Sequence, residues 1–336
     1  MHKTLTLYSF IILFAHLLSG QDIHFSQYDA SPHQLNPAMM GAFHGAYRVV
    51  LNNKDQWSSI GVPYRTNAVA LDFGIPFKYN LMGLGISGYQ DRAGRGGLNT
   101  SVASFSAAYH FALGYDGTND ISIGARVSYV QRSVSIFNFS FPDQYDGNYN
   151  FDQSANTNED FNAPSYNYLN AAFGMHWYYT PDDLPHFFAG FTLRNLTQPQ
   201  DAFFEPDIQR SIGGLLHGGT TFFIDKKLRL YPKFNYTFQG SSKSLIVGAD
   251  IEKYKVKSAV EKASIFAGVY YRIGDAFILL GGADISNIRF ALSYDFTVSS
   301  LSPANNNMGG AELSFIYKGL FKTKKGYKCP KFDPTF

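Results

Sequence analysis

Three glycines have the spacing of a nucleotide-binding loop. Gly83, Gly85 and Gly88 match G-x-G-x-x-G, which holds a pyrophosphate when it joins a strand to a helix and an acidic residue follows about 20 positions later. Here the glycines lie inside a strand-like run, and Tyr89–Arg92 follows them. Glycines inside strands allow a close approach of a neighbour or a bend. We therefore interpret them as structural.

Residues that bind metals or act as nucleophiles are scattered. The nine His residues form no H-E-x-x-H pair, and no Ser stands in G-x-S-x-G. The single Cys329 excludes an internal disulfide and is either an idle thiol or a link to another chain. We interpret the His residues as polar groups of an interior or an interface. The sequence predicts no cofactor, no metal and no enzyme.

Acidic side chains gather among Phe and Tyr in the segment Asn138–Ser165. Carboxylates can hold Ca²⁺, but their spacing fits no EF-hand loop. Aromatic-rich loops suit contacts with protein partners. The sequence therefore favours a loop that meets a partner, and it predicts these partner-binding residues here and in Leu196–Arg210: Asp152, Glu159, Asp160, Phe203 and Phe204.

The elements that carry these residues show a two-residue period. In Asn287–Phe296 every second residue is apolar, and the residues between them are polar or small. Side chains of a strand alternate between its two faces, so one face of this strand is wholly apolar. Two structures require such a strand: a soluble β-sandwich, or a barrel with lipid outside and water inside.

About fourteen such segments follow one another, an even number, as in bacterial single-chain barrels. The longer connections fall at one end: Asn53–Tyr64, Asn138–Ser165, Leu196–Arg210 and Thr297–Met308. Long outer loops and short inner turns are typical of outer-membrane barrels. We therefore predict an all-β, transmembrane antiparallel barrel of about 14 strands. The apolar parity changes after Tyr129, at Val130, which predicts either a bulge there or a strand that leaves the membrane and pairs differently beyond it.

Composition agrees with a barrel. Only 16% of residues are charged, against roughly 25% in soluble domains, and the chain has 23 Tyr and 31 Phe. A mean hydropathy of −0.16 is too polar for a helical membrane bundle. The net charge of +2 gives no indication of a nucleic-acid partner, and we expect none.

The start of the chain is typical of a secretory signal peptide. Lys3 precedes the mostly apolar run Leu5–Leu18, and the small Ser19 and Gly20 permit cleavage before Gln21. We expect a signal peptide over 1–20, an N-terminal segment over 21–45 that plugs the barrel or docks in the periplasm, and the barrel over 46–318. The basic tail 319–336 would lie in the periplasm, where it docks on a partner or is merely solvated.

Charged residues lie on the polar faces of the strands. Those predicted to face the lumen are Arg126, Arg229, Asp250, Arg289 and Asp295. They would either cross-brace the interior or line a selective pore. Arg289 and Asp295 would pair across neighbouring strands.

Several motifs together resemble a known family. The segment FSQYDASPHQLNPAMMG (Phe25–Gly41) is similar to the start of the PorP/SprF family of type IX secretion system membrane proteins, on Phe25, Ser26, Gln27, Leu35, Asn36 and Pro37. Further motifs follow in the family's order: Gln56–Trp57, Tyr271–Arg272, Ile285–Asp295, Gly309–Tyr317 and Cys329–Pro330. Where the family often has a Gly-Ser-His-Glu-like run, this chain has Gly310, Ala311 and Glu312.

The resemblance implies an outer-membrane barrel of a Gram-negative, Bacteroidota-type bacterium. It would be surrounded by outer-membrane lipid and serve type IX secretion, a route linked to gliding motility. Its expected partners are subunits of the secretion machinery and a secreted substrate or adhesin with a C-terminal secretion domain, whose export or anchoring it supports. The alternative is a passive porin or small-solute transporter.

Overall fold

The computed structural model describes residues 23–320 except 78–79, 95–96, 114–117, 136–138, 140, 146–150, 153–154, 156–164, 182–184, 201–208 and 257–261. None of the helices in these ranges is long and apolar enough to cross a membrane.

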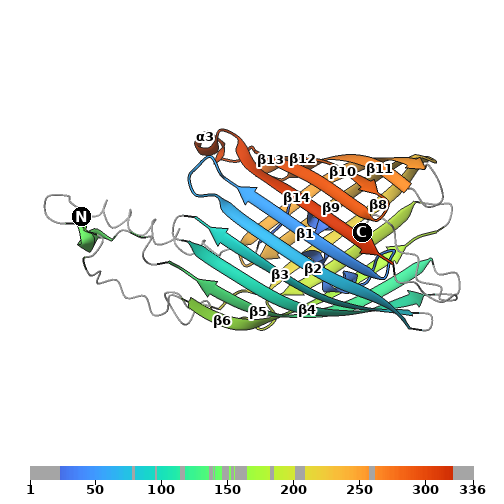
Figure 1. Cartoon of the computed structure of the whole chain (residues 1–336), viewed down its shortest axis with the longest axis horizontal. Helices are drawn as coiled ribbons and strands as arrows, with labels where there is room; N and C mark the ends of the chain where they lie inside the picture. The colour runs from blue at the N-terminus through green and yellow to red at the C-terminus, as the bar shows by residue number, and fades with distance from the viewer. Residues whose placement is uncertain are drawn as a thin grey trace, which may run out of the picture.

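Fourteen antiparallel strands form a closed barrel, in which each strand pairs with its neighbours in sequence and β1 pairs with β14 (Figure 1). Closure leaves no unpaired edge, which a strand structure in lipid requires. The strands are β1 Tyr47–Gln56, β2 Tyr64–Phe77, β3 Asn80–Ala93, β4 Leu98–Leu113, β5 Asn119–Ser133, β6 Ser165–Tyr179, β7 His186–Arg194, β8 Gly213–Asp225, β9 Leu228–Gln239, β10 Ser242–Val256, β11 Lys262–Arg272, β12 Ala276–Ile285, β13 Ile288–Thr297 and β14 Met308–Gly319.

The alternation predicted from the sequence decides which side chains face outward. On β13, Phe290, Leu292 and Phe296 are exposed, whereas Ser293 and Asp295 between them are buried. The same division holds around the barrel. Many large apolar side chains are exposed, whereas polar and charged side chains such as Arg48, Asp72 and Glu312 are buried. The predicted fold class, an antiparallel barrel of 14 strands, is confirmed.

The two ends of the barrel differ. At the end where β1 begins and β14 ends, here called the terminal end, the strands are joined by short connections such as 226–227 and 286–287. At the opposite end, the loop end, lie the connections 57–63, 134–164, 195–212 and 298–307. The last of these carries the short helix α3 (Ser302–Asn305), and η4 (Pro142–Gln144) lies in the second.

The bulge predicted in β5 is wrong. β5 pairs with β4 and β6 in regular register from Asn119 to Ser133, and Val130 faces the interior opposite Val102. The apolar parity of the sequence therefore changes because Val130 is an apolar residue on the inner face. The pairing register of β5 does not change there. The register shifts lie elsewhere, between Asp295 and Phe296 and between Phe223 and Asp225.

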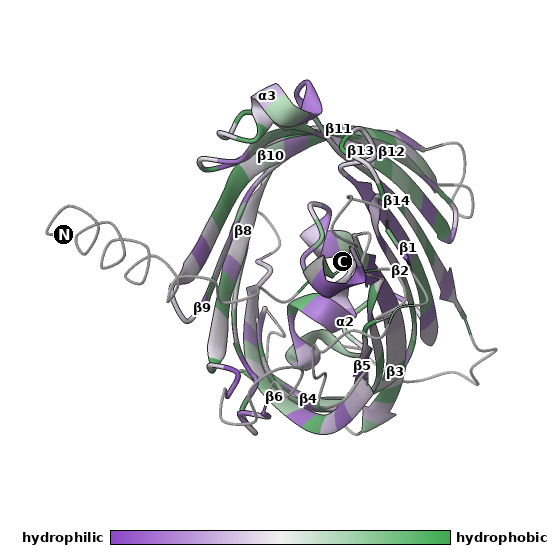
Figure 2. Ribbon diagram, turned by 90° about the vertical axis from the view of Figure 1, so that its left-hand side faces the viewer, coloured by the Kyte–Doolittle hydropathy of each residue, from purple (hydrophilic) through white to green (hydrophobic). Residues whose placement is uncertain are grey.

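Residues 23–45, here called the lumenal segment, lie inside the barrel. The segment contains η1 (Tyr28–Ala30), α2 (Pro32–Leu35) and η2 (Pro37–Met39), and Figure 2 shows α2 within the ring of strands. Its His24 carbonyl accepts from Lys54, close to the loop end of β1. Ala46, directly after it, donates its N–H to the Gly319 carbonyl at the terminal end. The segment therefore runs along the interior toward the terminal end.

Candidate functional site

The first part of the site joins the FSQ motif to β14. The backbone N–H groups of Ser26 and Gln27 donate to the two carboxylate oxygens of Glu312, at 2.6 and 2.9 Å. The Gln27 amide donates to the Ser293 hydroxyl at 3.0 Å and accepts from the Ser314 hydroxyl at 2.8 Å. One carboxylate thus satisfies two consecutive backbone donors, and the glutamine side chain spans β13 and β14.

Basic residues compensate the charge of this junction. Lys54 lies 2.8 Å from Glu312, and both side chains are 2% exposed. Arg272 lies 3.0 Å from Asp295, which also accepts the Ser26 hydroxyl hydrogen at 2.6 Å. Removal of one partner of a buried ion pair costs about 3–5 kcal/mol, because the other charge stays buried. The motif serine therefore joins a network in which each charge needs its partner.

A second ionic junction holds the other end of the lumenal segment. Asp72 of β2 accepts from Arg48 at 2.8 Å, from the Gly41 N–H at 2.8 Å and from His33 at 3.2 Å. Arg48 also donates to the Met39 carbonyl. Burial lowers the pKa of His33 below its ordinary value, and the neighbouring Asp72 carboxylate offsets this only in part. The imidazole is therefore held mainly in its neutral form.

The LNPA sequence explains the turn between His33 and Gly41, the two residues of the segment that bond Asp72. Asn36 is the N-cap of η2, because its side-chain oxygen accepts from the Ala38 N–H at 2.9 Å, and Pro37 occupies the first helical position. The Asn36 amide nitrogen donates to the Met175 carbonyl at 2.8 Å on β6. Leu35 is 2% exposed and packs in the apolar cluster of the segment. Asn36 thus both shapes the segment and attaches it to the wall.

Glycines of the wall make room for this backbone. A Cβ atom on Gly83 would overlap the Met40 carbonyl, and one on Gly124 would meet Pro37 and Ala38 at 2.5 Å. The first glycine of the apparent nucleotide fingerprint therefore lies where the lumenal segment packs on β3. This position requires the absence of a side chain and not the binding of phosphate.

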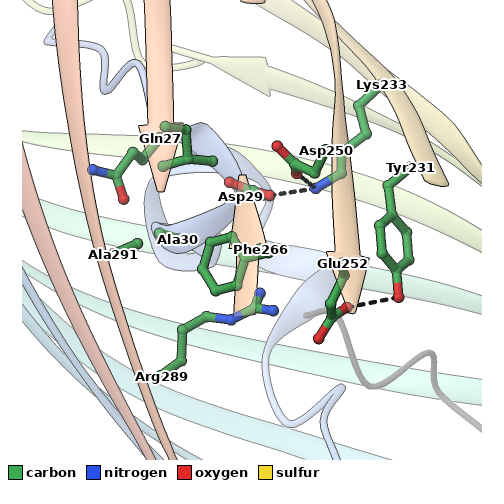
Figure 3. Close-up of a pocket in the computed structure, with 11 residues that line it drawn as sticks. Gln27, Asp29, Ala30, Tyr231, Lys233, Asp250, Glu252, Phe266, Arg289 and Ala291 are labelled. Carbon is green, nitrogen blue, oxygen red and sulfur yellow. Dashed lines mark hydrogen bonds and ion pairs between the residues drawn. The ribbon is translucent and has the colours of Figure 1, made fainter. Parts of the chain in front are cut away.

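A third junction joins η1 to β9 and β10. Lys233 lies 2.6 Å from Asp29 and 2.7 Å from Asp250, and Figure 3 shows the ammonium group between the two carboxylates. Burial tends to raise the pKa of Asp29, but the Lys233 ammonium outweighs it and holds the pKa below its usual value. A cavity of about 20 Å³ beside these groups has room for about one water molecule.

The residues predicted to face the lumen are distributed over this interior. Arg126 donates to the His33 carbonyl at 2.5 Å, and Asp250 belongs to the Lys233 junction. Arg229 stacks on the Tyr254 ring at 4.3 Å, away from the motif junctions. The predicted pairing of Arg289 with Asp295 is wrong. Both lie on β13, where Arg289 bonds Asp284 of β12 at 2.7 Å and Asp295 bonds Arg272 of β11.

The predicted partner-binding residues do not form a described cluster. Asp152 is exposed, and its N–H donates to the Gln144 carbonyl. Glu159, Asp160, Phe203 and Phe204 lie outside the described residues, as do Cys329, the predicted signal peptide and the basic tail after residue 320. In the described ranges no group of three or more His, Cys, Asp or Glu residues could hold a metal ion.

Sequence reasoning missed Glu312, Lys54 and Arg272 as functional residues. Glu312 had two signals, its inward parity on β14 and its place in a family motif. Arg272 had a signal in the family motif Tyr271–Arg272. Lys54 lies near a strand end, where sequence alone does not decide whether a long side chain reaches the lumen or solvent. Only the closed barrel brings residues 26 and 312 together.

The fold and the site define a class of protein: an outer-membrane-type β-barrel whose interior holds its own N-terminal segment through buried charges. The family model "Type IX secretion system membrane protein PorP/SprF" matches residues 17–317, and the chain belongs to this family. The resemblance seen in the FSQ and LNPA motifs is thereby confirmed. No curated protein matches the chain.

Solved structures with similar folds are outer-membrane barrels of low sequence identity. The CymD monoaromatic hydrocarbon channel has a TM-score of 0.51 at 9% identity, covering 88% of this chain and 94% of that one. A Pseudomonas aeruginosa FadL homologue gives 0.49 at 12% identity, covering 84% and 92%. A mutant of the TodX monoaromatic hydrocarbon channel gives 0.49 at 9% identity, covering 87% and 94%. At such identities the likeness of CymD concerns the fold alone.

Proposed function

We propose that the chain is a non-enzymatic docking component of the type IX secretion machinery in the outer membrane of a Bacteroidota-type bacterium. It supports the export or surface anchoring of a cognate secreted protein, such as an adhesin with a C-terminal secretion domain. The terminal end faces the periplasm and the loop end faces outward, following the usual asymmetry of loop lengths.

The observation that carries this proposal is the occupied interior. The FSQ and LNPA motifs and the wall residues that they contact hold this segment in place. The inner charges Glu312, Asp72 and Lys233 each bond the lumenal segment directly. Charges of the wall that bond the lumenal segment hold it in the interior. This favours a rigid platform over a path for solutes.

In this scheme the connections at the loop end carry the contacts with the partner. Asp152, Glu159, Asp160, Phe203 and Phe204 supply carboxylates and aromatic rings, which suit a protein interface. In this proposal Phe25–Gly41 and the basic tail are expected to face the lumen or the periplasmic machinery. No residue performs covalent chemistry.

Affinity purification of the tagged protein from outer membranes in mild detergent tests the proposal. We expect recovery of secretion subunits together with a secreted protein that carries a C-terminal secretion domain. Charge reversal at Asp152, Glu159 and Asp160 should weaken this capture while heat-modifiable migration of the barrel is retained. Recovery of neither class of partner would overturn the proposal.

Conductance separates this function from a passive porin. The purified intact barrel in a planar bilayer should show no steady ionic current, because the lumenal segment occupies its interior. A steady current from the unmodified chain, with the lumenal segment shown by mass spectrometry to be intact, would favour the porin.

A further inference from the structure

The outer surface of the barrel differs between its two halves. A strand needs about 9–11 residues to cross the apolar part of a membrane. β12 and β13 have 10 residues each, and their outward Phe277 and Phe296 lie next to the last residue at the loop end. β2 and β3 have 14 residues and β4 has 16. These longer strands, neighbours in the wall (Figure 1), therefore have room for a polar section beyond the apolar one.

Three rows of outward residues cross the longer strands and β1 near the loop end, and strand pairing places the members of each row directly opposite one another. The apolar row is Leu51, Val69, Gly88 and Ala103. The polar row, two residues nearer the loop end, is Asn53, Asn67, Gln90 and Ser101. The charged row, two residues further, contains Asp55, Arg65 and Arg92. With a rise of about 3.4 Å per residue, the surface changes from apolar to charged within about 14 Å.

An outer groove lies across the boundary between the apolar and polar rows. Its volume is about 750 Å³, and ligand pockets usually measure about 300–1,000 Å³. The apolar part of its lining includes Leu51, Val69, Leu313 and Phe315, and all four members of the polar row line it as well. The groove is therefore amphipathic along the direction of the strands.

Gly88 keeps this groove open. It lies on the outer face between Val69 and Ala103, and a Cβ atom built on it would meet the Val102 carbonyl oxygen at 3.2 Å. Gly88 is the third glycine of the apparent nucleotide fingerprint. Whereas Gly83 makes room for the lumenal segment inside the barrel, Gly88 makes room for a ligand outside it.

The three rows match three parts of one amphiphile. The apolar row suits an acyl chain, because it belongs to the surface that faces lipid. The side-chain amides of the polar row both donate and accept, which suits the hydroxyl and amide groups of a sugar. The charged row has two guanidinium groups and one carboxylate, a formal charge of 2 − 1 = +1, and guanidinium groups bind phosphate well.

We propose that the outer groove binds a phosphorylated glycolipid of the outer leaflet. One acyl chain lies over Gly88, the sugar bonds the polar row, and a phosphate group meets the exposed Arg92. Ile86 and Phe105, directly below the groove, are 56% and 53% exposed, so the groove continues the lipid-facing surface. This continuity favours a lipid over a protein as the occupant. The inference goes beyond the proposed function and shares with it only the outward orientation of the loop end.

Native mass spectrometry of the full mature chain, released from detergent micelles with added lipid, tests the proposal. The probes are bisphosphorylated lipid A, which is an acylated glucosamine disaccharide, its phosphate-free form, and phosphatidylglycerol. We expect one molecule of bisphosphorylated lipid A to bind at least tenfold more tightly than phosphatidylglycerol, which lacks the sugar. The phosphate-free form should bind about threefold more weakly than the bisphosphorylated one.

Matched glycine variants locate the acyl chain. Gly88→Leu places a side chain in the groove and should weaken the binding of bisphosphorylated lipid A at least tenfold. Gly281→Leu is the control, because Gly281 lies on the outer face of β12 and the nearest atom to its Cβ is 4.0 Å away. The control should leave the affinity unchanged, and heat-modifiable migration checks that both variants are folded.

Matched cation variants locate the phosphate. Arg92→Gln should weaken bisphosphorylated lipid A about threefold and leave the phosphate-free form unchanged, whereas Arg92→Lys should retain part of the difference. Lys243→Gln alters an exposed cation at the loop end of β10 and should have no effect.

Three results would overturn the proposal: unchanged affinity in folded Gly88→Leu, equal affinity for the two forms of lipid A, or binding of phosphatidylglycerol as tight as that of lipid A. Any of these, with secretion partners still captured in the affinity purification, would refute the groove alone. Lipid A binding that depends on Gly88 and Arg92, without captured partners, would refute the proposed function and leave the groove's lipid chemistry standing.

Discussion

Two walls of the barrel hold the lumenal segment in different ways. On the β13, β14, β1 and β2 side, carboxylates accept backbone N–H groups of the segment, and buried cations compensate them. On the β5 to β7 side, Arg126 and Arg194 donate to carbonyl oxygens of the segment, and a cavity of about 290 Å³ lies next to them. The first wall holds the segment through buried carboxylates and ion pairs, whereas the second donates to its carbonyls beside a cavity.

Glu312→Ala should have the largest effect of the changes that test this difference. It removes the acceptor of two backbone N–H groups and leaves Lys54 buried without its ion-pair partner. We expect a loss of about 3–5 kcal/mol in the attachment of the segment. Faster amide exchange at residues 26–27 and a new steady bilayer conductance would report it.

Asp55→Ala is the control for this change. Asp55 pairs with Arg65 on the outer surface, where the two side chains are 37% and 54% exposed. Exposed pairs contribute little, about 0–1 kcal/mol. If exchange in the lumenal segment rose equally in the two variants, the ionic attachment would not be the cause.

Gly83→Ala should have the next largest effect. Its new methyl group would overlap the Met40 carbonyl, so the backbone of the lumenal segment must shift. Overpacking of this kind costs about 1–3 kcal/mol. Gly281→Ala is the matched control, because the nearest atom to its Cβ lies 4.0 Å away. Equal thermal stability of the two variants would contradict the close packing on β3.

Acidification should loosen the segment through His33. The folded pKa lies below the ordinary 6.5, so the unfolded state binds a proton first as the pH falls. The stabilisation that neutral His33 gives to the folded state is therefore complete above pH 6.5. It declines below that pH, by up to about 1.4 kcal/mol per pH unit. The protection factors of the amides over residues 31–36, which are corrected for the pH dependence of intrinsic exchange, should therefore fall between pH 7 and 5. His33→Gln should show a smaller fall, and an identical pH profile of the protection factors would exclude this residue as the cause.

Arg126→Gln should have the smallest effect. It removes the hydrogen bond of a partly exposed side chain to the His33 carbonyl, and a bond of this kind contributes about 1 kcal/mol. Exchange over residues 31–36 should rise slightly, and no bilayer conductance should develop. A loss as large as that of Glu312→Ala would abolish the distinction between the two walls.

Much of the fold could be predicted from the sequence because a barrel strand repeats every two residues. The alternation in β13 placed Phe290 and Leu292 outside and Asp295 inside. The same rule misjudged β5, because Val130 is an apolar residue that faces the interior. Parity alone cannot distinguish an apolar lumenal residue from a change of register.

The pairing of inner charges could not be predicted in the same way. Arg289 and Asp295 share a strand and a face, but strand tilt and register bring Asp284 to the first and Arg272 to the second. Such partners depend on the offset between neighbouring strands, which alternation does not encode.

The sequence by itself determined the barrel, the inward or outward direction of most side chains and the family. Each of these follows from local alternation or from short motifs. Only the tertiary structure decided that FSQ bonds Glu312 and that Gly83 makes room for Met40. These contacts join residues up to 286 positions apart, and they exist only once the last strand closes on the first around the lumenal segment.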